Sequence, residues 1–276
     1  MANEKQQINK TARLTETAIM IAAAMVLSFI KLIDMPFGGS VTLFSMLPIA
    51  IVAFRYGVPW GLLAGLVNAV IQMLFGMKNL TYATSAGAAV AIVMLDYIVA
   101  FTVLGLAGMF RNKIKDNGTA LTLGCFVACL LRFLSHTIAG CTVWAGVSIP
   151  DADGLIYSLA YNAAYMIPET VVTMVGGYFV ANILTLTSPE VKRRKMEPKA
   201  TAALFTSIPV VVGIALIFVM IFSMVQTEDG FDITAIASAD IWDWIRIAVI
   251  ALVAGITASI IRVLMMAREQ EKKIAS

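Results

Sequence analysis

Long apolar stretches separated by short polar segments dominate the chain. A transmembrane helix needs about 20 mostly apolar residues, and eight stretches approach or exceed that length. They cover roughly residues 14–33, 41–57, 59–77, 84–110, 119–147, 156–187, 200–226 and 241–267. The second and third are short and are separated only by the turn Arg55-Tyr56-Gly57. The pattern therefore predicts an all-α integral membrane protein with eight spans, the first of them uncleaved.

Composition and charge agree with a membrane protein. Of the 276 residues, 60% are hydrophobic and only 13% are charged, whereas a soluble domain carries about 25% charged residues. The surplus of apolar side chains needs a lipid bilayer as solvent. The net charge is only +3, and the basic residues lie in short clusters between apolar runs, so nucleic acid is not an expected partner.

The basic clusters also predict the orientation. With the N-terminus in the cytoplasm, most basic residues fall on the inner side, as the positive-inside rule requires. These clusters are Lys5 to Arg13, Arg55, Arg111 to Lys115, Lys192 to Lys199, and Arg262 to Lys273. The outer loops hold mainly acidic residues, such as Asp34, Asp151 and Asp153. We therefore expect both termini to be cytoplasmic.

Several polar residues interrupt the fourth, fifth and sixth spans. Ionisable groups within a bilayer cost several kcal/mol unless they are paired or hydrated, so each marks a candidate site. Asp96 lies in the fourth span. Arg132 and His136 lie in the fifth with Trp144, and their spacing by multiples of four places them on one helix face. Tyr157 and Asn162 begin the sixth span.

This set of side chains indicates binding of a flat, cationic, nitrogen-rich heterocycle. A carboxylate balances the charge, aromatic faces attract the cation, and amide and hydroxyl groups recognise ring nitrogens. The sequence has no Walker A motif, no His-Glu-x-x-His and no local nucleophile–base signature. Its single histidine is incompatible with a His-rich metal site. We therefore expect a binding protein that is not an enzyme and uses no cofactor.

Simpler interpretations of the same residues remain open. Asp96 and Arg132 are also compatible with a structural ion pair, and His136 with a histidine of the core. Tyr161 and Tyr165 are typical of an interfacial aromatic belt. Glu169, beside Pro168, is either part of a pocket wall or a residue near water.

Five ordered segments, spanning about residues 13–187, resemble a known family. They are LTETAIMIAAA, GGSVTLFSMLPIAIVAFRYGVPWGLLAGL, LDYIVAFTVLGLAGMFR, LLRFLSHTIAGCTVW and YSLAYNAAYMIPE. They look like the thiamine-specific S component of energy-coupling factor (ECF) vitamin transporters. The resemblance implies a six-helix protein in the plasma membrane of a prokaryote. It implies capture of thiamine from outside and association with a transmembrane coupling protein and two ATPase subunits.

The resemblance also implies roles for individual residues. Asp96 matches the binding carboxylate of the family, which is glutamate in some members, and Arg132 matches a basic position that is lysine elsewhere. His136 and Trp144 match an aromatic pair that flanks the ligand. Tyr157 and Asn162 match polar contacts at the start of the sixth helix.

Two positions depart from the family's pattern. Some members carry a tryptophan after the first helix that covers the ligand, and here that place falls in residues 36–40. The lid contact is therefore absent or is made by Phe37. A tyrosine between spans three and four has only an approximate counterpart, Tyr82.

The first span carries a surface of small residues. Ala18 and Ala22 are one helical turn apart, and small residues allow helices to approach closely in lipid. In the family this face docks the coupling protein, while generic packing inside the bundle is the alternative.

The chain is expected to have two domains. Residues 1–190 are the six-helix thiamine-binding S-component domain, and residues 191–276 are a basic linker with two further transmembrane helices of unknown role. Two rival functions remain: an S component for another vitamin or cationic heterocycle, and an autonomous ion-coupled transporter that uses Asp96 and Arg132.

Overall fold

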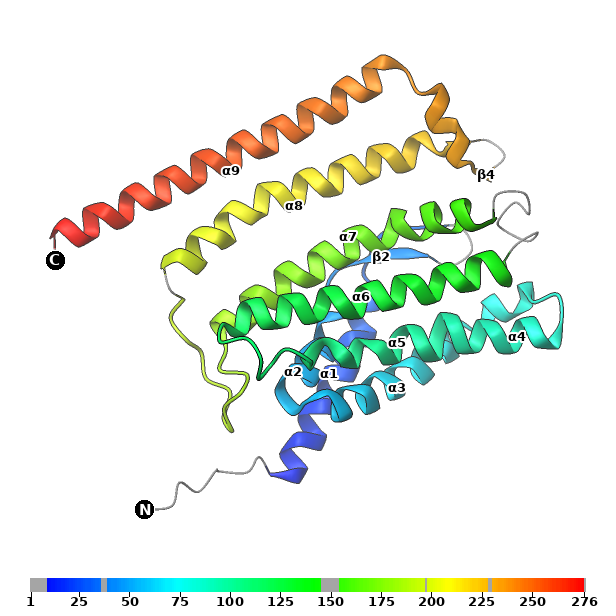
Figure 1. The fold of residues 1–276 in the computed structure, drawn as a ribbon, viewed down its shortest axis with the longest axis horizontal. Helices are drawn as coiled ribbons and strands as arrows, with labels where there is room; N and C mark the ends of the chain where they lie inside the picture. The colour runs from blue at the N-terminus through cyan, green and yellow to red at the C-terminus, as the bar shows by residue number, and fades with distance from the viewer. Residues whose placement is uncertain (1–8, 36–38, 145–153, 197, 228–229, 276) are drawn as a thin grey trace. The chain divides into compact units, whose positions relative to one another are not determined.

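The computed structural model describes residues 9–35, 39–144, 154–196, 198–227 and 230–275. The chain divides into two compact units, Met1–Arg194 and Lys195–Ser276. The first unit contains α1 (Lys10–Ser28), β1 (Lys31–Asp34), β2 (Ser40–Thr42), α2 (Leu47–Tyr56), α3 (Val58–Phe75), η2 (Met77–Tyr82), α4 (Ala86–Ile92), η3 (Val93–Val99), α5 (Ala100–Thr102), η4 (Val103–Gly108), α6 (Asn117–Thr142) and α7 (Gly154–Ile183) (Figure 1).

Seven helical segments within the described ranges are long and apolar enough to cross a membrane. In the first unit they are α1, α3, the stretch Ala86–Gly108, α6 and α7. The helical membrane class is therefore confirmed. The remaining predicted span, the second along the chain at residues 41–57, contains only the ten-residue helix α2, preceded by strand β2.

Helix α2 lies in the core of the first unit. Every residue from Leu47 to Arg55 is buried, as expected for a helix that is apolar on all sides. At 1.5 Å per residue it is about 15 Å long, roughly half the thickness of the hydrocarbon layer. The chain then reverses at Gly57, where a φ of 92° places the backbone in a region that favours glycine.

A short β-hairpin follows α1 and was not predicted. Residues up to 33 were expected to be helical, but α1 ends at Ser28, and β1 pairs antiparallel with β2, with Asp34 opposite Ser40. Over so short an apolar run, hydropathy does not distinguish strand from helix. A Cβ atom at Gly39 would lie 2.9 Å from the Tyr165 ring, so glycine allows the hairpin to lie against α7.

Glycines bring helix backbones together around η4. A Cβ atom at Gly105 would lie 2.2 Å from the backbone nitrogen of Leu62 on α3. One at Gly124 on α6 would lie 1.9 Å from the carbonyl oxygen of Ala107. Close approach through small residues is a common way to pack helices in lipid, and it positions η4 between α3 and α6.

Arg55 of α2 binds both α1 and the segment that follows α7 at one end of the bundle. Its buried guanidinium donates to Glu16 of α1, with Nε 2.6 Å from Oε2. It also donates to the carbonyl oxygens of Leu186, Ser188 and Pro189, which follow α7, at 3.0, 2.8 and 3.0 Å. Arg111 lies at the same end, where burial and then the charge of Arg55 lower the pKa of its guanidinium.

The second unit is a helical hairpin. It contains α8 (Pro198–Met224), β3 (Gln226–Thr227), β4 (Gly230–Phe231), η6 (Ile233–Ser238) and α9 (Ile241–Ala275). The two long helices match predicted spans 200–226 and 241–267, and they meet where a Cβ atom at Gly213 would lie 2.6 Å from Cβ of Ala254. Leu216 and Leu252 are exposed, as expected for helices that face lipid.

Candidate functional site

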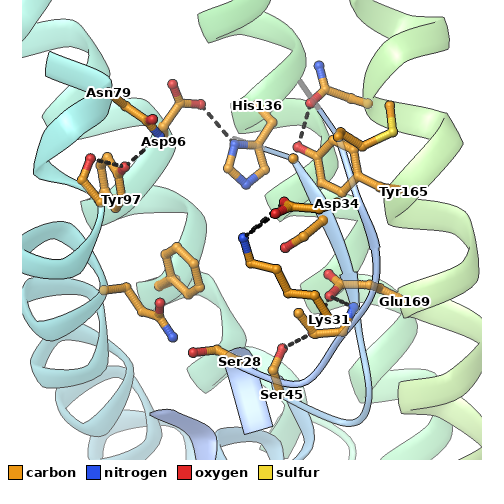
Figure 2. Close-up of a pocket in the computed structure, with 18 of the residues that line it drawn as sticks. Ser28, Lys31, Asp34, Ser45, Asn79, Asp96, Tyr97, His136, Tyr165 and Glu169 are labelled. Atoms are coloured by element: carbon orange, nitrogen blue, oxygen red, sulfur yellow. Dashed lines mark hydrogen bonds and ion pairs between the residues drawn. The ribbon is translucent and has the colours of Figure 1, made fainter. Parts of the chain in front are cut away.

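A polar cavity of about 380 Å³ lies in the first unit, within the size range of small-molecule sites. It is bounded by the C-terminal ends of α1 and α3, the β-hairpin, η2, η3, the C-terminal half of α6 and the N-terminal half of α7 (Figure 2). Arg55 lies in the last turn of α2 and contacts the N-terminal half of α1. The cavity therefore lies at the end of the bundle opposite Arg55 and Arg111.

A π-helical turn carries the central carboxylate. The segment Val93–Val99 forms the π-helix η3 and contains Asp96 and Tyr97. The Ser135 hydroxyl of α6 donates to the Leu95 carbonyl at 2.6 Å, and so gives this backbone group a partner in a turn with altered hydrogen bonding. Single π-helical turns occur frequently at functional sites.

Asp96 accepts hydrogen bonds from both aromatic residues that the sequence singled out. Its Oδ1 lies 2.8 Å from His136 Nδ1, and its Oδ2 lies 2.9 Å from Trp144 Nε1. Helix α6 ends at Thr142, before the predicted end at residue 147, so Trp144 reaches Asp96 from just beyond the helix.

Arg132 forms its ion pair with Glu169 and not with Asp96. Its Nη1 lies 3.4 Å from Glu169 Oε2, its Nε donates to His136 Nε2 at 3.3 Å, and its Cζ lies 4.5 Å above the Phe101 ring. The hypothesis of an Asp96–Arg132 ion pair is therefore wrong, because the guanidinium pairs with the carboxylate of α7.

Glu169 is a member of the site that sequence reasoning left unassigned. Its side chain is buried, and its Oε1 accepts from the backbone N–H of Thr42 at 2.9 Å and from the Thr42 hydroxyl. The available signal was its place one helical turn after Tyr165 within a span. The sequence did not indicate that Glu169 pairs with Arg132, because this pairing depends on how α6 packs against α7.

Two tyrosines of α7, Tyr161 and Tyr165, line the cavity. Tyr165 is buried and donates to Asn162 Oδ1 at 2.7 Å, and Asn162 Nδ2 donates to the Ser158 carbonyl at 2.9 Å. Tyr161 also lines the cavity, with its ring 6.1 Å from that of Tyr165. The aromatic-belt interpretation is therefore wrong for Tyr165, which has no place at a lipid surface.

The remaining candidate residues have different outcomes. Tyr82 lines the cavity, and its ring lies 5.8 Å from that of Trp144. Tyr157 is buried on α7 but does not line the cavity, so its role as a ligand contact stays a prediction. Phe37 lies outside the described residues.

Other polar groups complete the wall. Tyr97 donates to the Gly76 carbonyl at 3.0 Å and accepts from Asn79 Nδ2 at 3.0 Å. Lys31 and Asp34 of the hairpin form an ion pair at 2.9 Å. Figure 2 shows this pair on the hairpin side of the cavity, across from Asn79 and Tyr97. Sequence reasoning missed these groups because their helices and hairpin are brought together only in the folded chain.

Among the carboxylates that line the cavity, Asp96 is the one available to a ligand. Arginine is a donor only, so the bond from Arg132 to His136 requires a bare Nε2 and a neutral imidazole with its proton on Nδ1. The two groups that donate to Asp96 are therefore uncharged. Glu169 and Asp34 pair with cationic side chains instead. Among the described residues, no group of three or more His, Cys, Asp and Glu could hold a metal ion.

The small-residue positions of α1 lie on its outer face. Ala18 and Ala22 are exposed, in line with Leu14 and Val26, whereas Ala24 is completely buried. Packing inside the bundle therefore does not account for Ala18 and Ala22.

Sequence comparisons relate the chain to characterised proteins. The family described as Thiamine transporter protein (Thia_YuaJ) matches residues 14–191. A protein of Bacillus subtilis named thiamine transporter ThiT is 32% identical over 194 residues, which are 66% of this chain and 95% of the relative. The ThiT of Lacticaseibacillus paracasei is 27% identical over 205 residues, with 67% and 92% covered.

The fold is shared with a solved structure. It is titled as ThiT from Listeria monocytogenes, and it matches with a TM-score of 0.52 and 24% sequence identity. The match covers 62% of this chain and 94% of that chain.

Proposed function

Because the chain belongs to the Thiamine transporter protein family, we propose that it is the thiamine-binding S component of an ECF-type vitamin uptake transporter. The observation that supports thiamine is the arrangement around Asp96, a carboxylate held by two uncharged donors in an aromatic cavity. Thiamine combines a cationic thiazolium with a flat aminopyrimidine. The carboxylate balances the positive charge, and the faces of Trp144, Tyr82 and Tyr165 suit flat rings and a cation.

The cavity is proposed to open to the outside of the cell. Multiple spans make the chain a multi-pass membrane protein. Arg55 and Arg111 lie at the end of the bundle opposite the cavity, and basic segments favour the cytoplasmic side. Both termini are then cytoplasmic, and the site faces the medium from which the vitamin is taken.

Transport is proposed to depend on partner subunits. The sequence lacks a phosphate-binding loop, so ATP hydrolysis belongs to two separate ATPase subunits, linked through a transmembrane coupling protein. The exposed face of α1 with Ala18 and Ala22 is the proposed docking surface, because small residues there permit close approach of another helix.

Binding of thiamine to the purified protein, followed by tryptophan fluorescence, tests this function. Trp144 donates to Asp96 in the cavity, so a bound ring is expected to quench it. Trp60 lies at the other end of the bundle, where its ring is 4.0 Å from the Arg13 guanidinium. Trp144→Phe is expected to remove most of the ligand-induced change, and the control Trp60→Phe to retain it. Direct binding of labelled thiamine checks that each variant still binds.

The result also separates the rival functions. Micromolar or tighter binding of riboflavin or biotin, with no binding of thiamine, would refute the choice of vitamin. Uptake by the isolated chain in vesicles that lack ATPase partners would instead favour an autonomous transporter.

Removing the second unit is expected to leave thiamine binding intact. The family match ends at residue 191, and the cavity is built from residues of the first unit alone. A chain that stops after Arg194 should therefore bind thiamine with an affinity within about three-fold of the full chain, or about 0.7 kcal/mol. Titration of both proteins in the same detergent measures the difference. A large loss of affinity in a folded truncated chain would show that α8 and α9 take part in binding.

A further inference from the structure

Glu169 connects the hairpin that borders the cavity to the charged groups inside it. One carboxylate oxygen accepts from Thr42 of β2, and the other faces Arg132 Nη1 at 3.4 Å. The residue is only 2% exposed, and a buried charge without a partner costs several kcal/mol. The guanidinium and the two Thr42 donors therefore hold this carboxylate in one orientation. Figure 2 shows Glu169 on the hairpin side of the site.

Asp96 and Arg132 together keep His136 neutral with its proton on Nδ1: the carboxylate accepts at Nδ1, and the guanidinium leaves no room for a proton on Nε2. The guanidinium is planar, so a partner at Nη1 also sets the direction of the Nε–H bond. The Phe101 ring packs 4.5 Å from Cζ and restricts rotation further. With Nε donating to His136 Nε2, the imidazole proton must lie on Nδ1, where it faces Asp96 Oδ1 at 2.8 Å. The other neutral tautomer would direct a donor toward Arg132 and a bare nitrogen toward Asp96.

We propose that Glu169 is a positioning residue for the ligand site. By holding Arg132, it keeps a donor at His136 Nε2, so the imidazole stays neutral with its proton on Nδ1, and this N–H orients the Asp96 carboxylate toward the ligand. Glu169 thus acts on binding through three side chains without touching the ligand. Only the affinity measurement below depends on the proposed thiamine function, since the tautomer is a property of the ligand-free protein.

The single histidine of the chain allows a direct test. Protein labelled with ¹⁵N-histidine and purified without a histidine tag contains one imidazole, whose two nitrogen shifts report the tautomer. The wild-type protein is expected to show a protonated Nδ1 and a bare Nε2. Glu169→Gln is expected to add a proton on Nε2 and give the imidazolium form, because the neutral amide no longer holds the guanidinium there while Asp96 keeps the proton on Nδ1. Thr42→Val is the matched control, since it removes one donor to Glu169 but keeps the pair with Arg132.

A second variant protects the test against misfolding. A chain that carries both Glu169→Gln and Arg132→Met leaves no buried charge unpaired and has no guanidinium to donate to His136, so a proton on Nε2 should appear in the same way. A wild-type protein with its proton on Nε2 would overturn the proposal. So would an unchanged neutral imidazole, with its proton on Nδ1 only, in the folded double variant and in any folded Glu169→Gln protein.

Thiamine affinity provides the independent readout. Glu169→Gln is expected to lower affinity about ten-fold in the wild-type background and to have little further effect in a His136→Gln background. Such non-additivity is the signature of residues that act through one network. Equal losses in both backgrounds would contradict action through His136. If no variant and no wild-type protein bound thiamine, the proposed function would fail while the tautomer result still decided the role of Glu169.

Discussion

Replacing Asp96 with asparagine is expected to weaken thiamine binding by ~1.5–3 kcal/mol, the contribution of a hydrogen bond to a charged group. This loss corresponds to a change of about 10- to 150-fold in the dissociation constant. The substitution keeps the size of the side chain and removes its charge. The donors from His136 and Trp144 are uncharged, so no cationic side chain of the described residues already neutralises Asp96. Titration of purified variant and wild type measures the effect.

Two comparisons make the Asp96 result specific. Asp240→Asn makes the same chemical change at an exposed position of the second unit and is expected to leave affinity unchanged. A neutral thiamine analogue without the thiazolium charge should lose less affinity than thiamine does on Asp96→Asn. An unchanged thiamine affinity in a folded Asp96→Asn protein would show that this carboxylate only organises the cavity wall.

Introducing tryptophan at Ala18 or Ala22 is expected to abolish vitamin uptake in cells while leaving thiamine binding nearly intact. Both alanines are exposed on α1, so a large side chain has room in the isolated protein. In the assembled transporter the same side chain would keep the coupling protein from approaching α1. Uptake of labelled thiamine in cells and binding by the purified variants give the two measurements.

Matched variants distinguish docking from packing. Leu123→Trp enlarges another exposed position, on α6, and should retain uptake. Ala24→Trp enlarges a completely buried position of α1 and should destabilise the protein, since overpacking costs about 1–3 kcal/mol or more. Normal uptake by a folded Ala18→Trp or Ala22→Trp protein would exclude this face of α1 as the docking surface.

The hydropathy of the sequence was sufficient for the membrane class and for most helices. Transfer of apolar side chains into lipid depends mainly on their number and order along the chain, and α3, α6, α7, α8 and α9 follow the predicted spans. The turn at Gly57 was also evident, because glycine between two apolar runs indicates a reversal. The cost of ionisable groups in a bilayer was enough to select Asp96, Arg132 and His136, all of which line the cavity.

The tertiary structure alone decided how these groups are paired. Hydropathy does not tell which helix face meets which neighbour, so an ion pair of Arg132 with Asp96 stayed open, and the structure pairs Arg132 with Glu169 instead. For the same reason, the sequence favoured a place for Tyr165 at the membrane–water interface, whereas contact with the hairpin at Gly39 buries this side chain. The burial of α2, the β1–β2 pairing and the π-helical turn at Asp96 depend on contacts between segments far apart in the chain. The sequence by itself therefore determined which residues are costly to place in a membrane, and the packing of the helices determined which of them meet.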